Sequence, residues 1–197
     1  MQATLSSTGI IKSMQLPEVL SNHKEKSGGY GGDNWLHTYA NPGQRYPQIC
    51  YRYSGSPQDN ASAQLFRKLL KSTGLLFEDG KSNPAEEDLV RELELVLGNS
   101  GDNQLCNTES GPRGPRFHLL SLAVQEINAR SVLRLNGYFQ DHSREPVVYL
   151  DCIFIDASAA ESECRIEELF LESFPKRSFD DMHDDFEKVI ASIVWAN

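Results

Sequence analysis

The segment Met182-His183-Asp184-Asp185 contains residue types that bind metal ions, because imidazole nitrogens and carboxylate oxygens are common ligands. The segment lies in a predicted helix, where ligands need a spacing of three or four residues to share a face. Asp180 has that spacing to His183 and to Asp184, but no second cluster of ligands is evident in the sequence. We interpret these carboxylates as solvent-facing groups, favoured by the positive N-terminal end of the helix. No metal or cofactor is expected.

A second chemical pattern is Asp141-His142-Ser143, which holds the residue types of a catalytic triad. A triad needs three residues that converge from separate elements, so adjacent residues in a turn do not form one. The sequence also has no G-x-S-x-G motif. His37 and His118 lie in strand-like runs and are expected to be core or cross-strand residues. No catalytic residue is predicted, and an enzyme whose site is assembled from distant residues stays an alternative.

Two glycine-rich segments are expected to be loops. Residues 28–32 read Gly-Gly-Tyr-Gly-Gly, but a phosphate-binding loop joins a strand to a helix and ends in Lys-Ser or Lys-Thr. Asp33-Asn34-Trp35 follows instead, so a flexible connection is predicted at about 21–33. The segment 98–116 has four glycines and two prolines, and a loop of that length is either a contact loop or disordered.

The four cysteines show no C-x-x-C spacing, which excludes zinc fingers, thioredoxin motifs and dense disulfide scaffolds. Cys50 and Cys152 lie in strand-like runs and are expected to be small core residues. Cys106 lies in the long loop and is the cysteine expected to react most readily.

The elements that must position these residues are clearest over residues 117–195. Short turns separate apolar runs at 117–127, 132–139, 147–155 and 164–172, and short connections require antiparallel neighbours. The run at 117–127 fits a helical face equally well, and we interpret it as a strand because of the turn at 128–131. The run at 147–155 is apolar on both faces, which indicates a central strand.

A helix is predicted at 179–195 to close this meander. Ser178 and Asp181 fit a capping box at its start. An apolar stripe at helical spacing follows, and its members are Phe179, Met182, Phe186, Val189, Ile190 and Ile193. This stripe is expected to lie on the sheet.

The N-terminal part predicts a hairpin with strands at 35–39 and 49–53, a short edge strand near Ile10, and helices at about 57–73 and 84–97. The order is hairpin, two helices, loop, four-stranded meander and helix. The sequence therefore predicts an α+β fold in a single domain, 1–197, with helices packed on an antiparallel sheet.

The net charge is −9, and its location suggests the kind of partner. Residues 141–197 hold fourteen acidic and five basic side chains, whereas residues 1–140 hold fourteen of each. Such a chain repels phosphate backbones, which argues against nucleic acid, and it attracts a basic protein surface. Much of this charge also fits a solvated outer face. No apolar run has the length of a membrane span, and the N-terminus resembles no signal peptide, so the cytoplasm is expected.

The end of the chain resembles a known family. Residues 186–195, Phe-Glu-Lys-Val-Ile-Ala-Ser-Ile-Val-Trp, follow the phrase F-x-x-[IV]-x-x-S-[IF]-x-W that often ends members of the Mog1p/PsbP-like fold. The preceding Ile166–Pro175 and the early Leu16-Pro17 fit the same pattern, and the similarity is strongest over 128–195. The resemblance implies a sheet covered by a C-terminal helix. It also implies a mostly non-enzymatic protein, since its members include a Ran-binding factor, photosystem subunits and bacterial adaptor chaperones.

These observations predict a cytoplasmic protein-binding module, in particular a bacterial toxin-immunity protein that occludes a cognate, basic effector. An effector-loading chaperone or adaptor of a secretion system is the alternative. Exposed aromatic residues and the acidic helix would make the contacts: Trp35, Tyr39, Tyr51, Tyr53, Asp180, Asp181, Asp184 and Asp185. The aromatic residues could instead pack under the helices.

Overall fold

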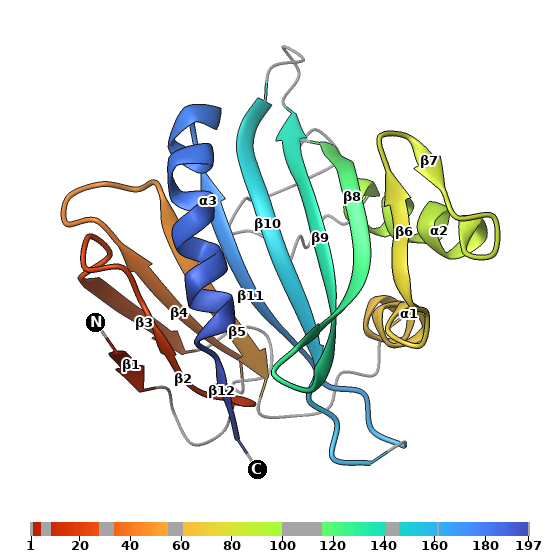
Figure 1. Ribbon diagram of the computed structural model, residues 1–197, viewed down its shortest axis with the longest axis horizontal. Helices are drawn as coiled ribbons and strands as arrows, with labels where there is room; N and C mark the ends of the chain where they lie inside the picture. Colours follow the sequence, from red (N-terminus) through yellow and green to blue (C-terminus); the bar gives the residue numbers. More distant parts are fainter. Residues whose placement is uncertain are drawn as a thin grey trace.

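The computed structural model describes residues 2–4, 9–27, 34–54, 61–99, 116–140, 146–160 and 162–196 of the 197-residue chain. These ranges contain twelve strands and three helices (Figure 1). The strands are β1 (Gln2–Thr4), β2 (Ile11–Gln15), β3 (Asn22–Ser27), β4 (Asn34–Ala40), β5 (Gln48–Ser54), β6 (Gly74–Glu78), β7 (Lys81–Ser82), β8 (Arg116–Ile127), β9 (Arg130–Gln140), β10 (Pro146–Asp156), β11 (Ile166–Ser173) and β12 (Val194–Trp195). The helices are α1 (Ala61–Leu69), α2 (Glu87–Asn99) and α3 (Lys176–Ala191).

Nine strands form one large sheet in the order β3-β4-β5-β11-β10-β9-β8-β6-β7, and every neighbouring pair is antiparallel. The meander β8 to β11 is present as predicted, and the segment 117–127 is a strand. β10 lies in the middle of the sheet, which confirms the central position inferred from its two apolar faces. The α+β class with an antiparallel sheet is therefore confirmed.

The pairing of β5 with β11 joins the N-terminal hairpin to the meander. The hairpin itself is β4 and β5, with Trp35 opposite Tyr53 and His37 opposite Tyr51. Tyr51 in turn lies opposite Leu169 of β11. Two segments separated by more than a hundred residues are thus neighbours in one sheet, and sequence spacing alone gives no sign of this contact.

Three strands of the large sheet were not predicted. β3 occupies part of the segment expected to be a flexible loop at 21–33, so that expectation is wrong for residues 22–27. β3 has no apolar residue because it is an edge strand, and charged side chains are common where a strand has only one partner. β6 and β7 form a small hairpin after α1, and Asp79-Gly80 turns between them with positive φ angles of 47° and 80°. This dipeptide is a strong hairpin signal that the sequence analysis did not use.

The predicted helices at 57–73 and 84–97 exist with different bounds. Leu70 and the two residues after it form turns beyond the end of α1, while residues 57–60 lie outside the described part. A turn precedes α2, in which the Ala85 N–H donates to Asn83 Oδ1 at 3.2 Å. Among the described residues, no helix is both long and apolar enough to cross a membrane.

α3 begins and ends differently from the helix predicted at 179–195. Pro175 is its N-cap and no side chain caps it, so the proposed capping box of Ser178 and Asp181 is wrong. Its buried residues are Phe179, Met182, Phe186, Val189 and Ile190, which are five of the six residues of the predicted stripe. The sixth, Ile193, is also buried but lies after the end of the helix. The helix stops at Ala191, because the chain turns at Ser192 to add β12 beside β2. β1, β2 and β12 form a separate three-stranded sheet.

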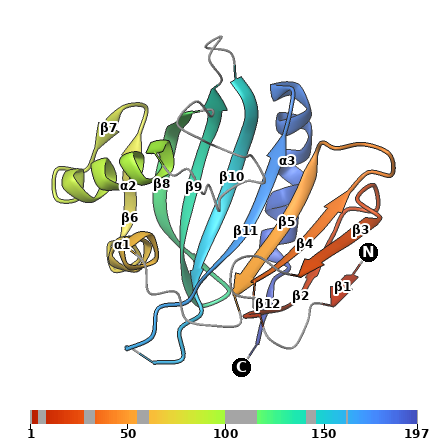
Figure 2. The ribbon, with the colours of Figure 1, turned by 180° about the vertical axis from the view of Figure 1, so that it is seen from behind.

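The large sheet has a hydrophobic core on each face, because successive residues of a strand point to opposite sides. On β10, Leu150, Cys152 and Phe154 belong to the core that also contains residues of α1 and α2. Ile153 and Ile155 belong to the core that contains α3 and β2. The two views from opposite sides show α3 across one face of the sheet and α1 near β6, towards the edge that is far from β3 (Figures 1 and 2).

Cysteines behave largely as predicted. Cys50 and Cys152 are fully buried in the core on the α1 side. Burial raises the pKa of both thiols. Cys106 lies outside the described residues, as do residues 100–115 of the predicted loop at 98–116 and the segment Asp141-His142-Ser143. The ends of that predicted loop belong to α2 and β8.

Candidate functional site

Two groups of histidine and carboxylate side chains lie on the α3 side of the large sheet. The first, which we name the arginine cluster, consists of Arg134, Asp151, His183 and Glu187. The second, the histidine cluster, consists of His23, Glu25 and His37. Each group could in principle hold a metal ion or transfer a proton, so their geometries decide between structural and functional roles.

The arginine cluster joins α3 to the centre of the sheet. Arg134 of β9 donates two hydrogen bonds to Asp151 of β10, from Nε to Oδ1 at 2.9 Å and from Nη2 to Oδ2 at 2.5 Å. The same Nη2 also donates to Glu187 of α3. His183 lies one helical turn before Glu187, and its Nε2 is 3.2 Å from Asp151 Oδ2.

Asp151 is the buried centre of this cluster, with none of its surface exposed. Burial opposes its ionisation, but the hydrogen bonds from Arg134 and His183 outweigh burial and lower the pKa of the carboxyl. The hydrogen bond to Asp151 is the main cause that raises the pKa of His183. Asp151 is therefore ionised and balanced by a guanidinium in two-point contact, which is the arrangement a buried carboxylate requires.

This geometry indicates a structural role for the arginine cluster. The guanidinium of Arg134 contacts both carboxylates, so it occupies the position that a metal ion would need. Asp151 and His183 have the contact of an acid–base pair, but a nucleophile must also be hydrogen-bonded to the histidine. In the described part of the chain no hydroxyl or thiol has that contact. The cluster therefore fixes α3 on β9 and β10.

The histidine cluster lies at one edge of the large sheet, on β3 and β4. Glu25 is directly opposite His37, and His23 is opposite Tyr39. His23 and Glu25 share a face because they are two residues apart on a strand. His23 Nε2 is 3.1 Å from His37 Nδ1, and His37 Nδ1 is 4.0 Å from Glu25 Oε2.

His37 is held from its other side by Tyr53. The His37 Nε2 lies 3.4 Å from the Tyr53 hydroxyl, and its ring stacks against those of His23 and Tyr53 at 5.4 and 5.6 Å. Burial lowers the pKa of His37, and this effect exceeds the opposite effect of Glu25. His37 is therefore a neutral imidazole at pH 7, with a lone pair available on one ring nitrogen.

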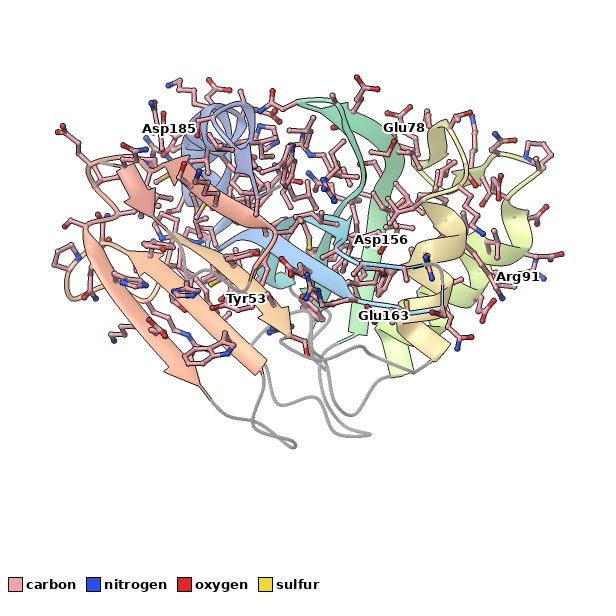
Figure 3. The ribbon with its side chains drawn as sticks, turned by 90° about the horizontal axis from the view of Figure 1, so that it is seen from below. Tyr53, Glu78, Arg91, Asp156, Glu163 and Asp185 are labelled. Carbon is pink, nitrogen blue, oxygen red and sulfur yellow. The ribbon has the colours of Figure 1, made fainter. Side chains whose placement is uncertain are left out.

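The aromatic residues predicted to contact a partner are mostly in the core. Tyr39, Tyr51 and Tyr53 are 3%, 0% and 1% exposed, and Trp35 is half-buried with its ring 6.4 Å from Tyr53. The three tyrosines therefore offer no exposed surface, and the alternative that they pack inside the protein is correct for them. Figure 3 shows Tyr53 beside the strands of the hairpin.

Tyr51 has a specific polar partner in this core. Its hydroxyl donates to Glu167 of β11 and accepts from the Ile11 N–H at 3.2 Å. Glu167 also accepts from the Ile10 N–H at 2.8 Å. Burial raises the pKa of Tyr51, and the nearby carboxylate of Glu167 raises it further. Tyr51 therefore ties β2 to the large sheet.

The four predicted aspartates lie on the exposed side of α3, and Figure 3 shows Asp185 at its outer surface. Asp180 pairs with Lys176 at 2.7 Å, and Asp185 pairs with Lys188 at 2.7 Å. Asp181 is 3.9 Å from Arg177. Asp180 does not join His183 in a metal site, since His183 turns to Asp151. The solvated outer face expected from the sequence is therefore present here.

Part of the negative charge of the C-terminal segment lies inside the protein. Asp151, Glu167, Glu168 and Glu172 are all less than 9% exposed. Glu168 accepts a hydrogen bond from Arg52 at 3.0 Å, yet burial still raises the pKa of its carboxyl. The count of acidic residues therefore overstates the negative charge on the surface.

A row of partly exposed rings lies on the α3 side of the sheet, beside the helix. α3 packs on β11, β10 and β2, and Figure 1 shows β8 and β9 to one side of it. His118 stacks on Tyr138 at 5.0 Å, and Tyr138 lies 5.8 Å from Tyr149. Tyr149 is followed by Phe179 of α3 at 5.9 Å. His118 is thus a cross-strand residue, as predicted, and His37 is a core residue.

Sequence reasoning missed most residues of both clusters. Asp151 stands in the apolar run Tyr149–Ile155, where a charge requires a buried partner, and this was an available signal. His23-x-Glu25 has the spacing of one strand face, but the segment was predicted to be a loop. Arg134 gave no signal, because its contacts with Asp151 and Glu187 depend on strand register and helix placement.

No protein-family model matches the chain, and no curated protein matches its sequence. Solved structures similar to this chain include that of LpqN involved in cell envelope biogenesis of Mycobacterium tuberculosis, with a TM-score of 0.45 and 7% sequence identity. The match covers 100% of this chain and 91% of LpqN. The resemblance to the Mog1p/PsbP-like fold stays a prediction.

Proposed function

We propose that this chain is a non-enzymatic protein-binding module that uses the α3 side of its sheet. The observation that carries the proposal is the row of partly exposed rings on β8, β9 and β10, defined by His118, Tyr138 and Tyr149. Tyrosine is enriched at protein interfaces because its ring has a large apolar area and a polar end. We name this surface the tyrosine face.

The first turns of α3 border the tyrosine face and suggest the charge of the partner. Lys176 lies 5.7 Å from the Tyr149 ring, but its charge is paired with Asp180. Tyr149 contacts Phe179 of α3, and the exposed carboxylates of Asp180, Asp181 and Asp184 lie on the same helix. A rim of carboxylates beside an aromatic surface favours a basic segment, because complementary charge speeds association and rejects acidic partners. The contact aromatics proposed here differ from those predicted from the sequence, whereas the three aspartates are among the four predicted ones; the fourth, Asp185, is paired with Lys188.

The specific form of this proposal is a toxin-immunity protein of the cytoplasm that covers the active site of a basic effector. Occlusion needs a rigid surface, and a nine-stranded sheet with a core on each face supplies one. An effector-loading chaperone is the alternative and predicts a different complex. It would bind an extended segment of its client, whereas an immunity protein would bind the folded toxin.

The test is a tagged pull-down from the native cell, washed at two salt concentrations, followed by affinity measurements with the purified partner. Tyr138→Ala combined with Tyr149→Ala is expected to weaken binding by at least tenfold, since central aromatic contacts dominate interface energies. Reversing the charge of Asp180, Asp181 and Asp184 is expected to slow association and reduce its dependence on salt.

The matched control reverses the charge of Glu87 and Asp88, which are exposed in the first turn of α2. These side chains have the same chemistry but belong to the helix beside the other core, so binding should be unchanged. A stoichiometric basic partner lost in the Tyr138 and Tyr149 variant supports the proposal. A partner that binds this variant with full affinity, or a protein that captures no partner, contradicts it.

A further inference from the structure

We propose that the histidine cluster is a binding site for a divalent transition-metal ion, with His23, Glu25 and His37 as the three protein ligands. The ligand atoms are His23 Nε2, His37 Nδ1 and a carboxylate oxygen of Glu25, which lie within 4.8 Å of one another. Two imidazoles and one carboxylate are a common ligand set for zinc and related ions. This inference departs from the expectation that no metal binds.

The two histidine nitrogens already have the separation of metal ligands. Nitrogen ligands that are each about 2.0–2.1 Å from a tetrahedral zinc ion are about 3.3 Å apart. His23 Nε2 and His37 Nδ1 are 3.1 Å apart. Without a metal, this distance is that of a hydrogen bond between the two rings, and an ion bound by both nitrogens would take the place of the proton between them. That proton would move to His23 Nδ1, so binding releases no proton and the charge of the site rises by that of the ion.

Tyr53 prepares His37 for this role. A histidine ligand usually donates its second ring N–H to an oxygen, which fixes its tautomer and orientation. His37 Nε2 is 3.4 Å from the Tyr53 hydroxyl, and Tyr53 is 1% exposed. With the proton on Nε2, the lone pair of Nδ1 points to His23 and Glu25.

The other two ligands are able to move to the ion. His23 and Glu25 are both exposed on the edge strand β3, and the Glu25 side chain is 43% exposed. Glu25 must approach, since its oxygen lies 4.0 Å from His37 Nδ1, and the exposed His23 ring must turn so that its Nε2 faces the ion instead of His37 Nδ1. His23 is oriented by stacking on Tyr39 at 4.7 Å. The buried ligand is thus fixed, and the exposed ligands close over an ion arriving from solvent.

Among the side chains that the structure describes, no protein cation fills the centre of the histidine cluster. No arginine or lysine among them forms an ion pair with Glu25, whose ion-pair partner is His37. The arginine cluster is the opposite case, because Arg134 bridges its two carboxylates. Three protein ligands leave a fourth position for water, so the ion would also be open to an exogenous ligand.

The test is a zinc titration of the untagged protein by calorimetry, repeated with Co²⁺, whose visible absorption reports ligand number and geometry. Wild type is expected to bind one ion per chain. His23→Ala and Glu25→Gln change exposed side chains and should abolish or strongly weaken this binding with the fold intact. Tyr53→Phe keeps the ring and should weaken binding by about 10- to 100-fold, as loss of an outer-shell hydrogen bond does.

Two control variants keep the proposal falsifiable. His118→Ala removes a histidine that stacks on a cross-strand tyrosine much as His23 does, at 5.0 Å, but among the described side chains it belongs to no group of three metal ligands. His183→Ala tests the arginine cluster. Both should bind zinc like wild type. Absence of stoichiometric binding, full binding by His23→Ala, or loss of binding in His183→Ala overturns the proposal. The titration uses no partner, so its failure leaves the protein-binding proposal standing.

Discussion

The arginine cluster and the histidine cluster contain similar ligands but differ in what lies between them. In the arginine cluster, Asp151 and Glu187 share the guanidinium of Arg134. In the histidine cluster, Glu25 and the two imidazoles face one another directly. Residue types alone therefore do not distinguish an ion pair that holds the fold together from a site that binds a ligand. The occupant of the centre distinguishes them.

Their positions in the sheet reinforce this difference. Asp151 lies on the central strand β10 and is fully buried, so its charge must be balanced within the protein. His23 and Glu25 lie on the edge strand β3 and are exposed, so water solvates the Glu25 carboxylate and an ion can reach both side chains. A central cluster serves stability, and an edge cluster is free to serve binding.

The largest expected effect is that of Arg134→Leu. Removing the guanidinium leaves Asp151 buried with only His183 as a partner, and breaking a buried pair in this way costs about 3–5 kcal/mol. Urea denaturation at pH 7 measures the free energy of unfolding. Arg91→Leu is the control, since its pair with Glu87 is exposed on both sides. A loss below 1 kcal/mol for Arg134→Leu would mean that the cluster does not hold α3 in place.

A smaller loss is expected for Tyr51→Phe, which tests the buried polar contact beside the histidine cluster. The substitution leaves Glu167 and the Ile11 N–H without the hydroxyl, and an unsatisfied buried group costs about 1–3 kcal/mol. Thermal and urea unfolding report the change. Tyr138→Phe, on the partly exposed tyrosine face, should change stability by less than about 0.5 kcal/mol. Equal effects of the two variants would contradict the assigned role of Tyr51.

Protonation of His183 in the arginine cluster is expected to make the free energy of unfolding depend on pH. Its folded pKa is raised, chiefly by the hydrogen bond to Asp151, with Arg134 and Glu187 also facing the ring. The stabilisation is therefore complete below the unfolded pKa near 6.5 and is lost as pH rises through the higher folded pKa. Because His183 is about a third exposed, we expect about 1 kcal/mol after screening by solvent.

Unfolding of wild type and His183→Gln at pH 5.5, 6.5 and 8.5 measures this effect. The difference in free energy of unfolding between wild type and His183→Gln should be largest at pH 5.5 and smallest at pH 8.5. A difference that grows with pH would show that the imidazolium does not contribute to the cluster. His118→Gln, which has no carboxylate in contact within the described residues, provides the baseline.

The parts of the fold that sequence predicted are those with repeated apolar patterns. The strands β8 to β11 and the stripe on α3 were recognised from the spacing of residues such as Val132, Leu133, Phe186 and Val189. β3 escaped notice because an edge strand with His23, Lys24 and Glu25 has no apolar pattern. The polar hairpin β6–β7 was missed although Asp79-Gly80 marks its turn.

The candidate sites were less predictable than the fold because they depend on register. His37 meets Glu25 only since β3 pairs with β4 in one particular register, and Asp151 meets Arg134 from a neighbouring strand. The tyrosines of the hairpin alternate as surface residues would, but β2 and α3 cover that face. Burial of Tyr51 and Tyr53 was therefore a consequence of distant segments that their local pattern does not reveal.

The smallest expected effect is that of Asp180→Asn on α3. Its pair with Lys176 is close, at 2.7 Å, but both side chains are more than half exposed. Exposed pairs at this helical spacing contribute about 0.3–0.5 kcal/mol, so urea unfolding should hardly change. Combined with Asp181→Asn and Asp184→Asn, the change should still be far below that of Arg134→Leu. A carboxylate on α3 that is dispensable for stability is free to meet a partner, whereas a large destabilisation would place these aspartates with Asp151 among the residues that hold the fold.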